Sequence, residues 1–147
     1  MRYSYKDLEL IKEPEVFNKD TKKEILQYAL GGLLYMPASN TKIADKLISG
    51  EYSFIKSMVL DLEDSLGDDM IGFGQANIVN VISKLDEAIK AGKFSYDDVP
   101  LIFIRIREHG QMQKTLQMLG DNIKYLSGFN IPKFDSTCCD KYISEFN

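Results

Sequence analysis

Four short apolar segments, alternating with segments of helical spacing, constrain this chain more than any other feature. The apolar segments cover residues 33–37, 57–61, 101–106 and 128–133, and each adjoins a turn signal. In the intervening segments apolar residues recur at steps of three and four, as at Ile78, Ile82, Leu85 and Ile89. Parallel strands need long crossovers, and helices are their usual form. The pattern therefore predicts successive βα units with right-handed connections.

Capping signals suggest where the helices begin. Thr21 and Glu24 have capping-box spacing and predict a short helix before the first strand. Ser39 and Asn40 are N-cap candidates for the helix after that strand. A last helix is expected to begin near Ser136, with Tyr142, Ile143 and Phe146 on one side.

The number of units suggests an unfinished barrel. We expect one domain over residues 1–147, with an N-terminal extension and helix at 1–30 and four βα units at 31–147. An open four-stranded parallel sheet leaves a face or edge uncovered, whereas a closed barrel needs eight strands and about 250 residues. The predicted fold is α/β: a (βα)4 half of a TIM (β/α)8 barrel, with parallel strands and outer helices.

Composition excludes several partners. Lys and Arg total 18 against 22 Asp and Glu, a formal charge of −4 without a basic stripe, so nucleic acid is not expected. No apolar run approaches the roughly 20 residues of a membrane helix, so we expect a cytoplasmic protein without membrane association. Cys138 and Cys139 are adjacent and lack the spacing of a zinc site, which indicates reduced thiols. A small-molecule substrate is the expected partner.

Acidic residues gather where the second apolar segment ends, in SMVLDLEDSLGDD. Asp61 and Glu63 are two residues apart, so on an extended chain both point to one side. Ligands of barrel folds bind at the carboxyl ends of the strands. Carboxylates suit Mg²⁺, which makes Asp61 and Glu63 candidates for its first or second shell. The alternative is a solvated loop with acids before a helix.

The third apolar segment, LIFIRIREHG, alternates with period two. If Ile102, Ile104 and Ile106 face outer helices, Arg105 and Arg107 face the barrel interior near its carboxyl rim. An unpaired buried cation is costly, so each arginine needs an anion. That anion is either a protein carboxylate or a substrate carboxylate or enolate oxygen, which the planar guanidinium fork suits. Both remain open for Arg105, and a protein partner is favoured for Arg107.

Three further features are weaker. His109 is the only histidine, and we interpret it as an ordinary loop residue. Lys133 lies at the end of the fourth segment, where it is a plain surface lysine, an anion ligand or a Schiff-base nucleophile. Gly72 and Gly74 form only a fragment of a phosphate-loop pattern, and we interpret their segment as a lengthened βα loop.

Taken in order, four motifs resemble one known superfamily. LLYMPASNTKIADKLISG, SMVLDLEDS, PLIFIRIRE and GFNIPKF are similar to strand-end motifs of the citrate lyase β-subunit, malyl-CoA lyase and 2-keto-3-deoxy acid (HpcH/HpaI) aldolase superfamily, closest to its bacterial TIM-barrel carbon–carbon bond lyases. The resemblance runs from about residue 33 to 134. It matches the family's Pro-containing turn to Pro37, its Asp-Leu-Glu-Asp motif to residues 61–64, its arginine to Arg105, and its Pro-Lys pair to Pro132 and Lys133.

The resemblance implies a Mg²⁺-dependent enzyme that breaks or makes a carbon–carbon bond beside a carbonyl, through an enolate of a 2-keto acid or a CoA-linked hydroxy acid. It assigns catalysis to Arg105 with Glu63 and Asp64, and substrate contact to Lys133, Pro37 and Arg107. Asp61 and Glu63 would lie in the second shell of the metal.

Departures from the family pattern limit these expectations. Ala38 stands where a glycine often follows the proline, and Arg107 where relatives often have Asn. The family's direct metal ligands come from its fifth and sixth strands, so we expect this polypeptide to be incomplete and inactive alone, lacking its C-terminal half or forming a homo-oligomer. The alternative is a small open doubly wound domain that binds a partner or accepts phosphate on Asp61 or Asp64.

Overall fold

Four parallel strands form one sheet whose order follows the chain, β1-β2-β3-β4. The computed structural model describes residues 16–146. Its strands are β1 (Leu34–Pro37), β2 (Ser57–Asp61), β3 (Leu101–Arg105) and β4 (Leu126–Asn130). Every neighbouring pair is parallel. The β3–β4 register shifts between Ile102 and Phe103, which leaves Ser127 as an extra residue in β4.

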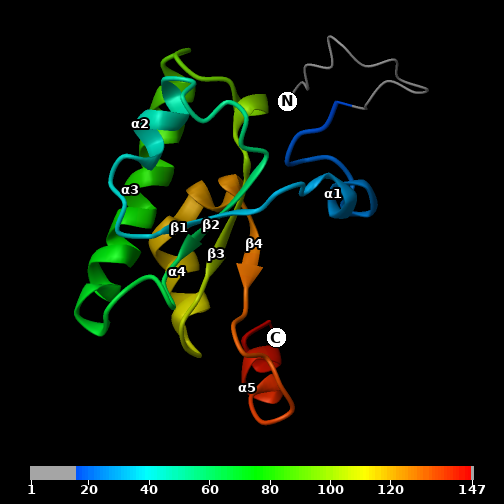
Figure 1. Cartoon of the computed structure of the whole chain (residues 1–147), viewed down its shortest axis with the longest axis vertical. Helices are drawn as coiled ribbons and strands as arrows, with labels where there is room; N and C mark the ends of the chain where they lie inside the picture. Colours follow the sequence, from blue (N-terminus) through cyan, green and yellow to red (C-terminus); the bar gives the residue numbers. More distant parts are fainter. Residues whose placement is uncertain (1–15, 147) are drawn as a thin grey trace.

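Helices connect each strand to the next. The α-helices are α1 (Lys23–Ala29), α2 (Ile43–Ile48), α3 (Ile71–Lys90), α4 (Gln111–Leu119) and α5 (Cys139–Ile143). Short 3-10 turns are η1 (Asp68–Met70), η2 (Tyr96–Asp98), η3 (Gly120–Tyr125) and η4 (Ser144–Phe146). In Figure 1, α2 and α3 lie on one side of the sheet and α1 on the other, while α5 lies beyond the carboxyl end of β4.

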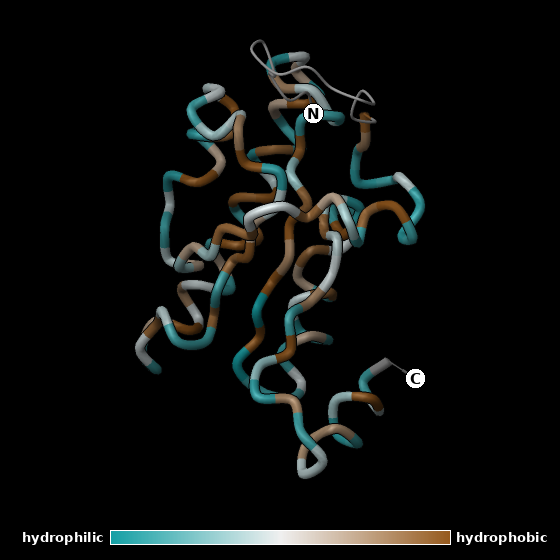
Figure 2. Tube along the Cα trace, turned by 45° about the vertical axis from the view of Figure 1, so that its right-hand side comes forward, coloured by the Kyte–Doolittle hydropathy of each residue, from teal (hydrophilic) through white to brown (hydrophobic). Residues whose placement is uncertain are grey.

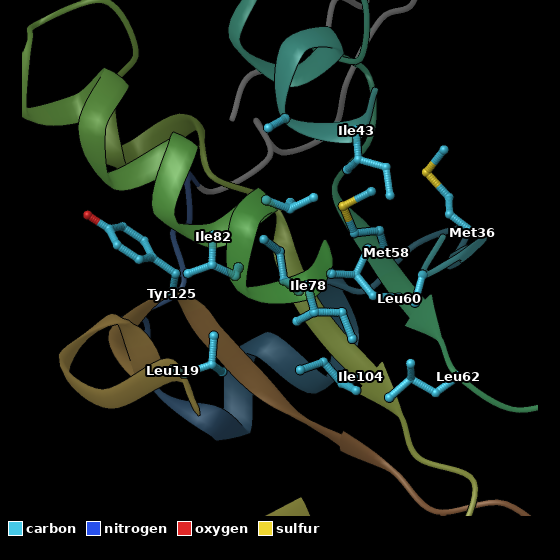
Figure 3. Close-up of a cluster of buried hydrophobic side chains, with 14 of the residues drawn as sticks. Met36, Ile43, Met58, Leu60, Leu62, Ile78, Ile82, Ile104, Leu119 and Tyr125 are labelled. Carbon is cyan, nitrogen blue, oxygen red and sulfur yellow. The ribbon is translucent and has the colours of Figure 1, made fainter. Parts of the chain in front are cut away.

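The main core lies between the sheet and its covering helices. Leu60 of β2 and Ile104 of β3 are fully buried there against Ile43 of α2 and Ile78 and Ile82 of α3, as Figure 3 shows. The predicted orientation of the alternating isoleucines is therefore correct. Figure 2 shows the same division along the chain, with hydrophobic segments gathered in the strands and polar ones in the outer loops.

The segment around Gly72 and Gly74 is helical, so its interpretation as a loop is wrong. It forms the first turn of the 20-residue helix α3. A Cβ atom at Gly74 would lie 2.7 Å from Leu66 Cδ1 and 2.9 Å from Leu62 Cδ2. Glycine is needed here because the helix packs directly on the end of β2, and a phosphate has no part in it.

Several predicted boundaries also shift. Lys22 and Lys42 hold the N-cap positions of α1 and α2 without side-chain caps. Thr21 Oγ1 instead accepts a hydrogen bond from Asn18 N, and Asn40 Oδ1 accepts one from Lys42 N. The fourth strand lies two to three residues earlier than predicted. The last helix begins at Cys139, and Ile143 is half exposed instead of sharing the buried side of Tyr142.

The second face of the sheet is covered in part by the segment before β1. Leu26 and Leu30 line a cavity together with Leu101, Phe103 and Ser127 near the amino ends of β3 and β4. Beyond it, Leu33, Val59, Phe103 and Phe129 line an apolar hollow of about 460 Å³. No helix in the described part of the chain is both long and apolar enough to span a bilayer.

This arrangement is half of a (βα)8 barrel. In such a barrel the strands follow chain order and the helices lie outside. A doubly wound domain would instead reverse its strand order and carry helices on both faces. The α/β half-barrel expected from the sequence is therefore confirmed.

Candidate functional site

The carboxyl ends of β2, β3 and β4 bring together charged side chains that are distant in sequence. Asp61 ends β2 and is the register partner of Arg105, which ends β3 and is in turn the partner of Asn130 in β4. Glu63 and Asp64 follow Asp61 in the loop beyond β2. Three of the predicted catalytic residues, Arg105, Glu63 and Asp64, thus meet at one rim.

Arg105 is the centre of this cluster. Its Nε and Nη2 donate to the two carboxylate oxygens of Asp61, at 2.6 and 2.8 Å. Its Nη1 lies 3.0 Å from Glu63 Oε2 and 3.1 Å from Asp64 Oδ2. The guanidinium edge is therefore held by a bidentate pair, while Nη1 is shared by two carboxylates.

Asp61 is buried, yet it stays ionised. Burial pushes the pKa of its carboxyl up, but hydrogen bonds from Arg105, from the Glu63 amide and from Ser65 outweigh it and lower the pKa to about 2. The hydrogen bond to Asp61 likewise raises the pKa of Arg105 above its ordinary value. Both groups carry full charge at neutral pH. With a side chain only 4% exposed, Asp61 is poorly accessible as a phosphoacceptor.

Asp61 also shapes the acidic loop. Its Oδ1 accepts the Glu63 amide at 2.9 Å, and its Oδ2 accepts the Ser65 amide at 3.3 Å. The loop therefore folds back over the carboxylate. This turn presents the Glu63 and Asp64 side chains to Arg105.

Lys133 joins the cluster from the segment after β4. Its Nζ lies 2.7 Å from Glu63 Oε1, and this hydrogen bond raises the pKa of the Lys133 ammonium. Among residues 16–146 it is the one non-glycine residue with positive φ, at 49°. A protonated lysine suits anion binding more than Schiff-base formation.

The remaining substrate candidates lie at different distances from this cluster. Arg107 Nη1 donates to the carbonyl oxygens of Glu63 and Leu66, at 3.3 and 3.0 Å, and its Nη2 pairs with Asp68. It therefore ties down the loop after β2, as its expected protein partner implied. Pro37 is exposed at the end of β1, in register with Asp61.

A cavity of about 490 Å³ opens beside the cluster. Glu63, Asp64, Arg107 and Lys133 line it, with Tyr142 from α5 opposite. Both cations and carboxylates thus face one space large enough for a small organic acid. Tyr142 was not among the predicted site residues, because nothing in the sequence indicates that α5 returns to the end of β2.

Two side chains of the opposite sheet face were also not predicted. The ring of Tyr35 in β1 lies over Arg105, with the guanidinium carbon 5.2 Å from its centroid. The Tyr35 hydroxyl accepts a hydrogen bond from Asn130 Nδ2. The period-two pattern that places Pro37 beside Asp61 also places Tyr35 on that face, so the signal was present.

His109 lies apart from the cluster. Its Nε2 is 3.3 Å from Glu145 Oε1 of η4, and its ring packs near Tyr142. The sequence gave it no partner, because Glu145 is 36 positions away and approaches only when the C-terminal segment folds against the start of α4.

The cluster does not fit Mg²⁺ as a set of direct ligands. Asp61 gives both oxygens to Arg105, and Glu63 is shared between Arg105 and Lys133. Within residues 16–146, no group of three or more His, Cys, Asp and Glu side chains is arranged to hold a metal ion. The charge of the carboxylates is balanced mainly by Arg105 and Lys133.

Comparison with known proteins agrees with the fold and the location of the site. A family model described as a C-C bond lyase of the TIM-barrel fold matches residues 24–147. Comparisons with curated proteins and with solved structures give no significant match. Since the matched residues make up well over half of its length, the chain belongs to the C-C bond lyase family of the TIM-barrel fold.

Proposed function

We propose that this protein is a carbon–carbon bond lyase of the citrate lyase β-subunit type, which cleaves a 2-keto acid or a CoA-linked hydroxy acid through an enolate. The observation that carries the proposal is the position of Arg105 at the carboxyl rim, with one edge fixed by Asp61 and Nη1 directed to the charged cavity. Fixed donors at the point where negative charge develops are a major source of catalysis.

The Nη1 group of Arg105 is the best contact for a substrate. Of its two carboxylate partners, Glu63 is buried, whereas the Asp64 side chain is 66% exposed. An exposed ion pair is weak, so a substrate oxyanion can replace Asp64 at Nη1 with little loss. Lys133, whose side chain is 80% exposed, supplies a second cation beside the same space.

The bond-breaking step then balances as follows. Asp64, once displaced, takes the proton from the substrate hydroxyl, and the oxygen forms a carbonyl as the carbon–carbon bond breaks. The electron pair of that bond passes to the second fragment as an enolate, whose oxygen is stabilised by Arg105. The enolate carbon is finally protonated from solvent.

Magnesium and a CoA thioester substrate are expected from the resemblance alone. Asp61 and Glu63 do not supply a coordination set, and every step above uses only side chains of this chain. Tyr142 and Pro37 are near enough to the rim to limit the shape of the substrate.

The test is cleavage of a panel of 2-keto hydroxy acids and CoA-linked hydroxy acids, with product measured with and without added Mg²⁺. We expect Arg105→Ala to lower kcat/KM about 100-fold or more. Arg105→Lys should recover little, because an ammonium cannot hold Asp61 and Nη1 partners together. No cleavage of any substrate, or full activity in Arg105→Ala, would overturn the proposal.

A further inference from the structure

The two outer strands of the sheet are joined by a side-chain contact across the face opposite α2 and α3. Asn130 of β4 donates through Nδ2 to the hydroxyl of Tyr35 in β1, at 2.5 Å. Strands β2 and β3 lie between them in the sheet. The contact joins residues 95 positions apart, so it forms only when the sheet curves.

Arg105 lies beneath this contact. Its guanidinium carbon is 5.2 Å from the centre of the Tyr35 ring, within the range of a cation–π interaction. Asn130 is also the register partner of Arg105. The guanidinium group therefore has one face against an aromatic ring and one edge on Asp61, which leaves Nη1 directed toward Glu63 and Asp64.

We infer that Tyr35 and Asn130 are positioning residues that fix the plane of Arg105, so that Nη1 is the donor presented to the charged cavity. Tyr35 restrains the face of the guanidinium group, and Asn130 restrains Tyr35 through its hydroxyl. Asp61 alone fixes one edge and allows the group to tilt about it. Fixing the plane reduces the reorganisation needed when a substrate oxyanion arrives. The link to substrate rests on the proposed function, whereas the restraint on Arg105 does not.

Arginine side-chain NMR measures this restraint without any substrate. The chain contains only three arginines, Arg2, Arg105 and Arg107, so an Nε–Hε spectrum of ¹⁵N-arginine protein has three signals. Substitution Arg107→Lys and Arg2→Lys assigns them. Solvent exchange of the Arg105 Hε, measured at mildly acidic pH, reports how firmly the 2.6 Å bond to Asp61 is held.

We expect Tyr35→Leu to speed Arg105 Hε exchange about tenfold, because it removes both the ring and its hydroxyl. Tyr35→Phe keeps the ring, and Asn130→Ala removes the donor to the hydroxyl, so each should speed exchange only about threefold. Tyr28→Leu is the matched control, because Tyr28 lies on α1 with its residue surface 86% exposed. The Arg107 signal should not change in any of these variants.

The inference is overturned if Tyr35→Leu leaves Arg105 Hε exchange within twofold of wild type while circular dichroism shows the fold retained. It is equally overturned if Tyr35→Phe is as fast as Tyr35→Leu, because the ring would then contribute nothing. Absence of lyase activity together with the expected NMR changes refutes the proposed function and leaves the restraint on Arg105 intact. Activity with unchanged exchange has the opposite meaning.

Discussion

The two faces of the four strands are built from different side chains, although the residues alternate along the same segments. Leu60 and Ile104 point to the helices and are fully dry. Asp61 and Arg105, their neighbours in sequence, point to the other face and pair with each other. The helix-covered face gains its stability from close packing, and the opposite face gains specificity from a few directed charges. A single strand therefore serves both the core and the site.

Removing the charge of Asp61 should have the largest effect and would break the comparison if it did not. We expect Asp61→Asn to lower the free energy of unfolding at neutral pH by about 3 kcal/mol, because Arg105 loses its bidentate partner. The folded pKa of Asp61 is lowered to about 2 from its ordinary 3.8, so this stabilisation is present above pH 4 and lost as pH falls toward 2.

Urea unfolding at several pH values measures this difference. The gap between wild type and Asp61→Asn should narrow as the pH falls through that window. Asp68→Asn is the control, because its side chain is 87% exposed and should change stability by less than about 0.5 kcal/mol. A gap that does not vary with pH would show that the Asp61 charge is not the source of the stability.

A substitution in α3 tests the packed face. Gly74→Ala should destabilise the protein by about 2 kcal/mol, because the new methyl group would overlap Leu66 and Leu62. Gly72→Ala, two residues earlier in the same helix, meets nothing within 4 Å and should stabilise it by about 0.5–1 kcal/mol. Thermal unfolding of both variants decides the matter: equal shifts would mean that α3 does not pack closely on β2.

The smallest expected effect concerns the rim. Lys133 holds a positive φ that costs an ordinary side chain about 1 kcal/mol. Both Lys133→Gly and Lys133→Ala remove the pair with Glu63, but only glycine relieves the backbone. Lys133→Gly should therefore unfold at higher urea than Lys133→Ala, by about 1 kcal/mol. Equal stability of the two variants would indicate that the backbone there relaxes freely.

The sequence predicted the regular parts of the fold well. The bounds of β2 were correct because SMVLD is a continuous apolar run that ends at an acid, and the outward direction of Ile102 and Ile104 followed from period two. The start of α3 was missed because two glycines resemble a loop, while their role depends on contact with Leu62 and Leu66. Such a contact is visible only once the helix lies on the strand.

The site was predicted only in part for a similar reason. Asp61, Glu63 and Arg105 could be placed together because each follows a strand whose end meets the same rim. The choice of partner for Arg105 stayed open, since sequence separation gives no distance between side chains. Tyr35 and Asn130 meet across the curvature of the sheet, and no local pattern encodes curvature.

The extra residue in β4 determines which side chain accompanies Arg105. Leu126 is paired with Ile102, so uninterrupted counting would set Phe129 beside Arg105; with Ser127 unpaired, Asn130 takes that place. Deleting one residue from this strand would turn its polar amide toward the helices and an aromatic ring toward the guanidinium group. The identity of the rim is thus written partly as a matter of counting, in a position that touches neither Asp61 nor the cavity.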